Sequence, residues 1–332
     1  MTSTQTRPTP AEPALRRGKF SDPDLTAKGE RRASVAPDKL ETLWINTGTL
    51  CNIECLNCYI ESSPTNDRLV YITAEEVIPY LDEIAALDLG TSEIGFTGGE
   101  PFMNRDLIAM AEAALVRGHK VLVLTNAMRP MQRPRNKAGL LRLKEAFGNR
   151  LTIRVSLDHY TRALHERERG PRSWDPAIAG TDWLAESGFD LAICGRTSWH
   201  EDEAAARAGY AALFAARGWP VDAADPARLV LLPEMDERAD VPEITTACWG
   251  ILGKSPSQMM CASSRMVVKR KGAAAPTVLP CTLLPYLPAF EMGETLAEAA
   301  RADGGMFDRG AVKLCHPHCA KFCVLGGGSC SA

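Results

Sequence analysis

The sequence lacks any apolar run long enough to cross a membrane, and its charges nearly balance. A transmembrane helix needs about 20 consecutive apolar residues, and the 332 residues contain no such stretch. Lysine and arginine number 38 against 41 aspartates and glutamates, which gives a formal net charge of −3. Without a basic excess, we expect neither a nucleic acid nor an anionic membrane as partner.

The N-terminal segment also lacks the apolar core of a secretory signal peptide. Residues 1–37 are rich in threonine, proline, alanine and charge, and Arg16-Arg17 is not followed by an apolar stretch. This composition predicts a mobile arm and a cytoplasmic protein. In the reducing cytosol the 11 cysteines would stay thiols rather than form disulfides, so metal ligation is the better explanation of their number.

Cysteine is almost missing from the middle of the chain and is concentrated in two places. Cys51, Cys55 and Cys58 follow the apolar run Leu43–Ile45, and seven more cysteines lie after residue 247. A closed structural zinc site takes four protein ligands. Three thiolates on a cubane iron–sulfur cluster leave one iron open to a substrate or cofactor. A zinc knuckle with a distant fourth ligand is the alternative.

Short apolar runs alternate with amphipathic stretches between residues 40 and 235. The expected strands are Leu43–Ile45, Glu93–Phe96, Lys120–Leu124, Leu151–Ser156, Leu191–Cys194 and Leu229–Leu232. The expected helices are Thr73–Leu87, Arg105–Arg117, Ala138–Phe147, Ser173–Ser187 and Glu201–Arg217. Strict alternation predicts an α/β fold of parallel units, namely a partial (β/α)6 barrel of the TIM type, with an open doubly wound sheet as the alternative. In either fold the chemistry lies at the carboxyl ends of the strands.

The pattern Cys51-x3-Cys55-x2-Cys58, placed after the first strand, resembles that of the radical S-adenosylmethionine (SAM) enzymes. The resemblance implies that the three thiolates bind a 4Fe–4S cluster whose fourth iron is chelated by SAM. An electron from the cluster then cleaves SAM to a 5′-deoxyadenosyl radical, which abstracts a substrate hydrogen. The residue before the third cysteine is commonly aromatic in the family, whereas here it is Asn57, with Tyr59 directly after. We expect both Asn57 and Tyr59 to be cofactor-binding residues.

The segment that follows the second strand resembles the family motif that holds the SAM amine. It reads Gly98-Gly99-Glu100-Pro101; two glycines let a backbone approach a ligand closely, and Glu100 can accept from an ammonium group. Later strand ends also match family positions. The resemblance adds these residues to the SAM-binding set: Thr125, Asn126, Ser156, Asp158 and Arg169.

No catalytic residue stands out among the remaining candidates. His159 follows Asp158 at a strand end, where a role in proton transfer and a plain loop hydrogen bond are equally open. Cys194 lies on an apolar strand and is expected to be a buried, inert thiol.

The pattern changes near residue 240, which we take as a domain boundary. We expect an arm at 1–37, a radical SAM barrel at 38–240 and a cysteine-rich domain at 241–332, with a hairpin of Met266–Lys269 and Thr277–Leu279. This domain resembles the SPASM and Twitch extensions, which bind one or two auxiliary 4Fe–4S clusters. The implied ligands are Cys261, Cys281, Cys315, Cys319, Cys323 and Cys330, with Cys248 as a further candidate. Two closed cubanes need eight thiolate ligands, and this region has seven. A zinc site is an alternative, because His316 and His318 lie among these cysteines and imidazole is a good zinc ligand.

The resemblance implies an enzyme that abstracts hydrogen with a 5′-deoxyadenosyl radical and completes an oxidation or bond formation with an auxiliary cluster. Such enzymes need an electron donor such as flavodoxin or ferredoxin. The substrate is a small metabolite or a peptide; the short polar arm is unlike a leader-binding domain. A non-catalytic iron–sulfur scaffold or electron carrier is the alternative of another class.

Overall fold

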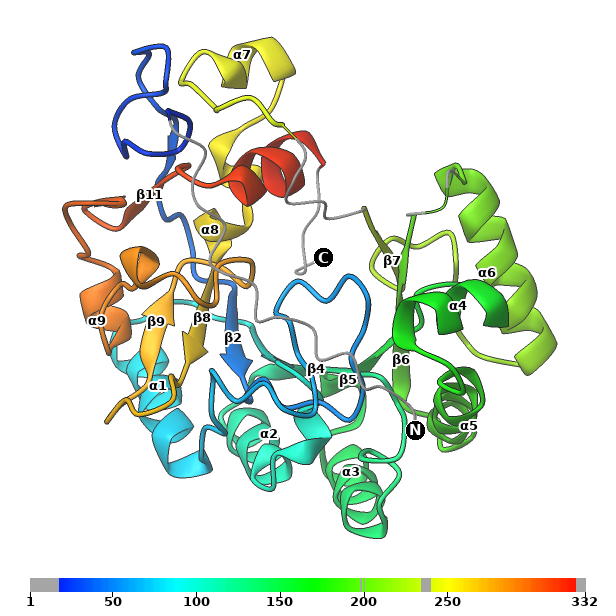
Figure 1. Cartoon of the computed structure of the whole chain (residues 1–332). Coiled ribbons are helices and arrows are strands. Elements are labelled where there is room, and N and C mark those ends of the chain that lie inside the picture. Colours follow the sequence, from blue (N-terminus) through cyan, green and yellow to red (C-terminus); the bar gives the residue numbers. More distant parts are fainter. Residues whose placement is uncertain (1–17, 198, 200, 234–239, 327–332) are drawn as a thin grey trace, which may run out of the picture.

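The computed structural model describes residues 18–197, 199, 201–233 and 240–326, and its centre is a curved sheet of eight strands (Figure 1). The strand order is β7-β6-β5-β4-β3-β2-β8-β9. Strands β2 to β7 run in chain order and are parallel. Their bounds are β2 (Thr42–Asn46), β3 (Glu93–Thr97), β4 (Lys120–Thr125), β5 (Leu151–Ser156), β6 (Asp190–Arg196) and β7 (Leu229–Leu232). The six predicted strands are confirmed.

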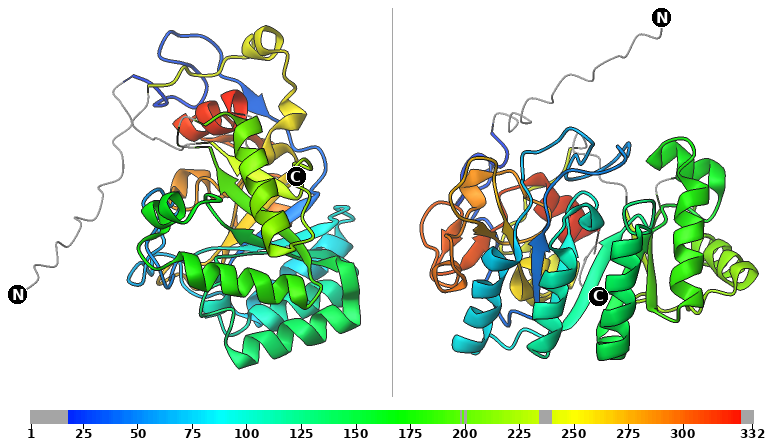
Figure 2. Two further views of the ribbon diagram at one scale, coloured as in Figure 1. Left: turned by 90° about the vertical axis from the view of Figure 1, so that its right-hand side faces the viewer. Right: turned by 90° about the horizontal axis from the view of Figure 1, so that it is seen from below.

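The helices that connect these strands lie along the outside of the curved sheet (Figures 1 and 2). They are α1 (Ala74–Ala86), α2 (Leu107–Val116), α3 (Pro134–Phe147), α4 (Arg162–Arg169), α5 (Trp174–Glu186) and α6 (Glu203–Arg217). Since the order of β2 to β7 never reverses and both sheet edges stay apart, the fold is the predicted partial barrel and not the doubly wound alternative. Helix α1 begins with a capping box formed by Thr73 and Glu76.

Helix α4 was not predicted from the sequence. Its eight residues, RALHERER, contain only two apolar side chains, so no apolar stripe marks it as a helix. Its C-terminal half nevertheless supplies the buried Glu168 and Arg169, whose side chain is 11% exposed, to the region around the cysteine loop.

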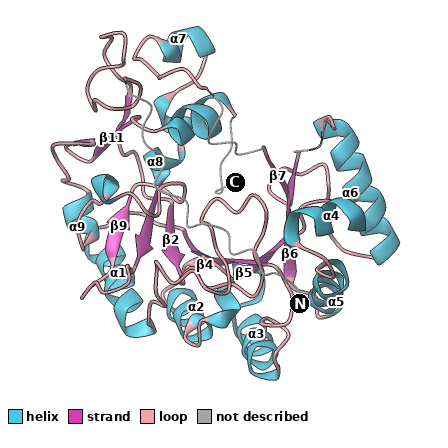
Figure 3. Cartoon of the chain, viewed as in Figure 1, coloured by secondary structure: helices cyan, strands magenta, loops and turns pink. Residues whose placement is uncertain are grey.

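The region after residue 240 shares the sheet of the barrel. Strand β8 (Ser264–Val268) pairs in parallel with β2, and β9 (Thr277–Leu279) returns antiparallel to β8, which confirms the predicted hairpin. The expected boundary near residue 240 stays a prediction, but one sheet runs across it. Loops and short helical turns make up most of the remainder (Figure 3). The turns include α7 (Cys248–Leu252), α8 (Met260–Ser263), α9 (Leu296–Ala299) and a π-helix (Cys319–Leu325).

Residues 18–37 correct the prediction of a mobile arm. Strand β1 (Ser34–Val35) pairs with β11 (Ala311–Lys313), which in turn pairs with β10 (Phe307–Asp308). Arg32 is 4% exposed, forms a 2.7 Å ion pair with Glu243 and also donates to three backbone carbonyls. The segment is held mainly by buried polar contacts to distant residues, which composition does not reveal. Residues 1–17 lie outside the described part of the chain.

The ion pair between Arg32 and Glu243 leads to a stability prediction. Glu243 also accepts from the amides of Phe20 and Ala27, so removing its cation leaves a buried charge with incomplete compensation. We expect Arg32→Ala to lower the free energy of unfolding by about 3–5 kcal/mol. Lys19→Ala, which breaks an exposed ion pair with Asp240, should cost less than about 1 kcal/mol. Equal melting temperatures for the two variants would contradict this account.

Membrane-spanning helices were not expected, and within the described ranges no helix has the length and apolarity to cross a bilayer.

Candidate active site

The three clustered cysteines lie in the loop between β2 and α1 and line a cavity at the carboxyl ends of the strands. Strands β3 to β7 each contribute side chains or backbone to the same cavity, as the fold predicts. Nine of the expected cofactor-binding residues line it: Tyr59, Gly98, Gly99, Pro101, Thr125, Asn126, Ser156, Asp158 and Arg169. The structure therefore gathers residues spread over more than one hundred positions around the cysteine loop.

The two glycines of the second motif are required by close packing against the cysteine loop. A Cβ atom on Gly98 would lie 2.5 Å from the carbonyl oxygen of Gly48, and Gly98 has a φ of 134°. A Cβ atom on Gly99 would lie 2.1 Å from the carbonyl oxygen of Leu50. Backbone hydrogen bonds from Gly99 to Gly48 and from Glu100 to Leu50 join the two loops. The glycines thus fix the cysteine loop as well as forming the cavity wall.

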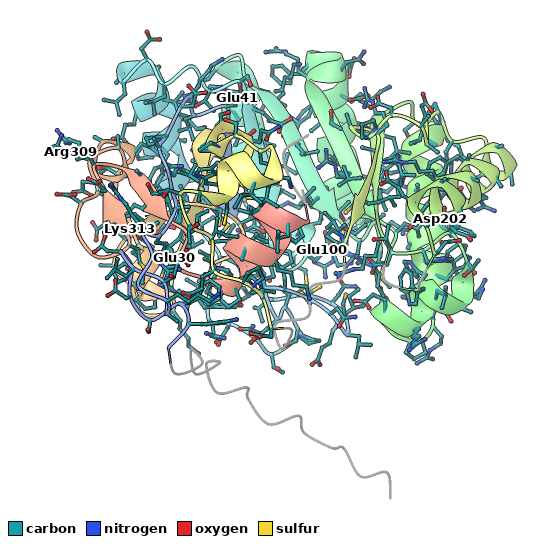
Figure 4. All side chains as sticks on the ribbon, turned by 90° about the horizontal axis from the view of Figure 1, so that it is seen from above. Glu30, Glu41, Glu100, Asp202, Arg309 and Lys313 are labelled. Atoms are coloured by element: carbon teal, nitrogen blue, oxygen red, sulfur yellow. The ribbon has the colours of Figure 1, made fainter. Side chains whose placement is uncertain are left out.

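Glu100 does not line the cavity and is buried; Figure 4 labels it near the middle of the molecule. Its carboxylate accepts from Thr125 Oγ1 at 2.8 Å, the amide of Asn126 at 2.9 Å and the amide of Phe102 at 3.2 Å. Burial raises the pKa of Glu100 to about 6, so the side chain is ionised at neutral pH. Glu100 therefore holds the end of β4 in place, and its contact with an ammonium group stays a prediction.

Asp158 is a buried anion that holds two arginines. Its carboxylate lies 2.6 Å from Nε of Arg169 and 3.2 Å from Nε of Arg196. Burial acts to raise the pKa of Asp158, but the two guanidinium groups outweigh it and the pKa is lowered. For Arg169, burial opposes the charge, yet Asp158 outweighs this effect and the pKa is raised. All three groups thus remain charged beside the cavity.

Asn57 has a different position from the one expected. It does not line the cavity; its backbone amide and side-chain amide donate to the two oxygens of Glu168 at 2.9 and 2.8 Å. Arg196 donates to the carbonyl of Asn57 at 3.2 Å, and the amide of Leu56 donates to the carbonyl of Glu168. The peptide between Cys55 and Cys58 is therefore held from both α4 and β6.

Glu168 and Arg196 were not identified from the sequence, because neither belongs to a motif. The one available signal for Arg196 was its position at the end of an expected strand. Cys194 was expected to be buried and inert, but it is half-buried and lines the cavity, which follows from its place beside Ser156 in the sheet. His159 does not line the cavity; its Nε2 lies 3.4 Å from Glu201 and its ring stacks on Tyr160.

The double hydrogen bond between Glu168 and Asn57 leads to a second prediction. Residues that orient metal ligands typically change metal affinity or activity 10- to 100-fold when they are replaced. We expect Glu168→Gln to slow SAM cleavage by about that factor and to lower the iron bound after reconstitution. Glu166→Gln, on the same helix, should behave like the parent protein because Glu166 makes no hydrogen bond to the cysteine loop. An unchanged rate and iron content for Glu168→Gln would refute the positioning role.

The match to a family model decides the family. Residues 45–203, which contain all three cysteines and the strands β3 to β6, match the model described as "Radical SAM superfamily". Residues 45–203 belong to the radical SAM superfamily.

Two curated relatives of the radical SAM segment have different activities. The chain is 32% identical over 172 residues to a GTP 3′,8-cyclase of Rhodococcus opacus strain B4, covering 50% of this chain and 45% of the relative. It is 27% identical over 160 residues to the Fe-coproporphyrin III synthase of Methanosarcina barkeri strain Fusaro, covering 47% of this chain and 37% of the relative. The matches thus span less than half the length of these relatives, which leaves the substrate open.

The fold similarity extends beyond the radical SAM segment. A solved structure of Streptococcus suis SuiB bound to the precursor peptide SuiA superposes with a TM-score of 0.58 and covers 81% of this chain and 66% of that one. The two sequences are 14% identical, so the comparison concerns the fold alone.

The residues of the radical SAM cavity fit the two cofactors that the family implies. Three thiols on one loop, with no fourth thiol ligand on that loop, match a cluster that keeps one iron for SAM. Burial raises the pKa of Cys51 to about 12 and that of Cys55 to about 11. A bound metal is needed to stabilise such buried thiolates.

Four cysteines of the C-terminal region line a second cavity. They are Cys261, Cys281, Cys319 and Cys323, and His318 lies on the same wall. Cys315 does not line it, and its Sγ lies 3.4 Å from the carbonyl oxygen of Asp22. Cys248 is also absent from the wall and contacts Thr245. Cys330 lies outside the described residues.

A single zinc ion and a cubane cluster hold their thiolates at different distances from one another. Among the residues with a described position, no three histidine, cysteine, aspartate or glutamate side chains converge closely enough to hold one metal ion. Thiolates around a single zinc ion lie within about 4 Å of one another, because each is about 2.3 Å from the metal. A cubane holds each thiolate on a different iron and so spreads them farther apart. A closed cubane would take all four thiols that line this cavity.

Proposed function

We propose that this chain is an enzyme that cleaves SAM reductively and uses the resulting 5′-deoxyadenosyl radical to abstract a hydrogen atom from its substrate. The observation that supports this most strongly is the single cavity shared by Cys51, Cys55, Cys58 and the Gly98–Gly99 backbone. When bound, the 4Fe–4S cluster supplies the electron for SAM cleavage, delivered to it by a donor such as flavodoxin or ferredoxin.

The residues of the chain bind and orient the reactants in this proposal. The backbone at Gly98 and Gly99 provides a wall against which the methionyl part of SAM can lie. Arg169 provides a cation for the SAM carboxylate, and Asp158 sets the direction of its guanidinium group. Ser156 and Asn126 line the same cavity and offer hydrogen bonds to the nucleoside.

We further propose that Cys261, Cys281, Cys319 and Cys323 hold one auxiliary 4Fe–4S cluster. A substrate that has lost a hydrogen atom must give up one more electron and a proton to become an oxidised or newly bonded product. An auxiliary cluster, when bound, can accept that electron, since cluster potentials extend from roughly −700 to +450 mV. The four thiols that share the second cavity support a single closed cluster, so Cys315 is assigned no ligand role here.

For the substrate we favour a peptide, and the reaction is then a cross-link or a dehydrogenation. The support is the fold shared with SuiB, whose structure carries a precursor peptide. A small metabolite is the second candidate, favoured by the higher identity to a GTP 3′,8-cyclase. A search for modified products, made once with peptides and once with small metabolites as substrates, would distinguish the two candidates.

The test of the enzymatic proposal is release of 5′-deoxyadenosine. Protein reconstituted without oxygen and mixed with SAM and dithionite is expected to produce it, with about eight irons per chain if both cubanes are present. Intact cluster spectra without any 5′-deoxyadenosine would favour a non-catalytic scaffold or electron carrier. About four irons with one zinc would remove the auxiliary cluster from the proposal.

A further inference from the structure

Arg265 is a buried cation without a carboxylate partner in the described chain. It lies on β8, is 6% exposed, and donates from Nη1 to the carbonyl oxygens of Cys261 at 2.6 Å and Ser264 at 2.7 Å. Burial lowers the pKa of Arg265, and its hydrogen bond to the carbonyl oxygen of Cys261 joins it to the segment that carries the Cys261 thiol, which shares a cavity with Cys281. Both thiols line the second cavity.

Three other arginines with little exposed surface pair with carboxylates. Arg32 pairs with Glu243, and Arg169 and Arg196 share Asp158. A guanidinium group stays protonated in proteins, and removing it from water is costly unless an anion compensates its charge. For Arg265, whose Nη1 contacts the backbone of Cys261, the metal-bound thiolates of the proposed auxiliary cluster would supply the compensating negative charge.

We propose that Arg265 compensates the negative charge of the auxiliary cluster and makes that cluster easier to reduce. This inference rests on the proposed function of Cys261 and Cys281 as ligands. Each electron that enters a cluster adds one negative charge, and a fixed cation nearby stabilises the reduced form more than the oxidised form. Residues around a metal site tune its potential in this way without touching the metal.

This role matches the step that the auxiliary cluster serves in the proposed reaction. The substrate loses a hydrogen atom to the 5′-deoxyadenosyl radical, one electron to the auxiliary cluster and one proton to a base. A higher potential at the auxiliary cluster favours transfer of that electron. Arg265 therefore acts through the cluster, by holding a positive charge near it. It is a positioning residue and not a catalytic residue.

The test is a redox titration of the auxiliary cluster, followed by electron paramagnetic resonance. The parent for all variants carries Cys51→Ala, Cys55→Ala and Cys58→Ala, so that the auxiliary signal is observed alone. We expect Arg265→Gln to lower the midpoint potential by about 59 mV or more, which corresponds to a tenfold loss in the equilibrium constant for one-electron uptake. Arg265→Lys, which keeps the charge, should shift it less.

Two controls separate charge from structure. Arg270→Gln removes an arginine that follows the same strand but pairs with Glu291, and it should leave the midpoint potential unchanged. If Arg265→Gln loses its auxiliary iron, retention of iron and potential by Arg265→Lys still supports the proposal. Loss of iron in both variants would restrict Arg265 to capping α8 and overturn it. An unchanged potential in iron-replete Arg265→Gln would overturn it as well.

Failure of the underlying function has a different signature. If the parent with the three alanine substitutions binds no iron at all, the assignment of the four C-terminal cysteines as cluster ligands is wrong. This result is obtained before Arg265 is changed.

Discussion

The Cys55→Ala variant is expected to release no 5′-deoxyadenosine when it is mixed with SAM and dithionite. Cys55 supplies one of three thiols to the cavity, and the peptide that follows it is anchored by Glu168 and Arg196. Two thiolates cannot hold three irons of a cubane. The chemistry of SAM cleavage should therefore disappear rather than slow down. Chromatography of the nucleoside products, with detection at least a thousandfold below the parent rate, provides the measurement.

Cys248→Ala is the matched control for this experiment, since it removes a thiol that lines neither of the two cysteine cavities. It should retain the parent rate. SAM cleavage by Cys55→Ala at a rate comparable to the control would show that another residue replaces the thiolate, and the three-cysteine site would have to be revised.

The second large effect is expected for Cys281→Ala, which should separate SAM cleavage from product formation. Cys281 lines the C-terminal cavity with Cys261, Cys319 and Cys323, whereas the SAM cavity is built from other residues. Iron should fall from about eight to about four per chain, because one cubane is lost. The variant should still release 5′-deoxyadenosine in unproductive turnover but form no oxidised or bonded product.

Iron analysis and nucleoside chromatography on the same preparation test both parts of this prediction, with Cys248→Ala again as the thiol control. Equal loss of SAM cleavage and product would indicate that the C-terminal region is needed for folding. A folding defect in the C-terminal region would reach the SAM cavity because β8 pairs directly with β2, which leads into the cysteine loop. A melting curve of Cys281→Ala distinguishes a folding defect from the loss of an electron acceptor.

The agreement between sequence and structure differs from one element to another for physical reasons. The strands β2 to β7 were predicted because each is a short apolar run between amphipathic helices. Helix α4 was missed because its stability depends on buried charges and tertiary contacts instead of an apolar stripe. Residues 18–37 were misjudged for the same reason, as the pair of Arg32 with Glu243 joins positions far apart in the chain.

In the candidate site, too, some residues were predicted from the sequence and others were not. Spacing alone identified Cys51, Cys55 and Cys58, because ligands of one cluster can lie on one short loop. The glycine motif was also recognisable, although its tight packing on the cysteine loop was not. Cys194 was assigned to the core because a strand pattern does not tell which face borders a cavity.

By itself the sequence determined where the strands β2 to β7 lie along the chain, the three-thiol loop and the radical SAM motifs, since these depend on neighbours a few residues apart. Only the tertiary structure decided which four of the downstream thiols share a cavity, and that Glu168 and Arg196 hold the loop from two sides. It also placed the buried Arg265 against the backbone carbonyl of Cys261, one of those four cysteines. Such contacts join residues that are distant in the chain, so they depend on how the sheet and its loops pack and not on any local pattern.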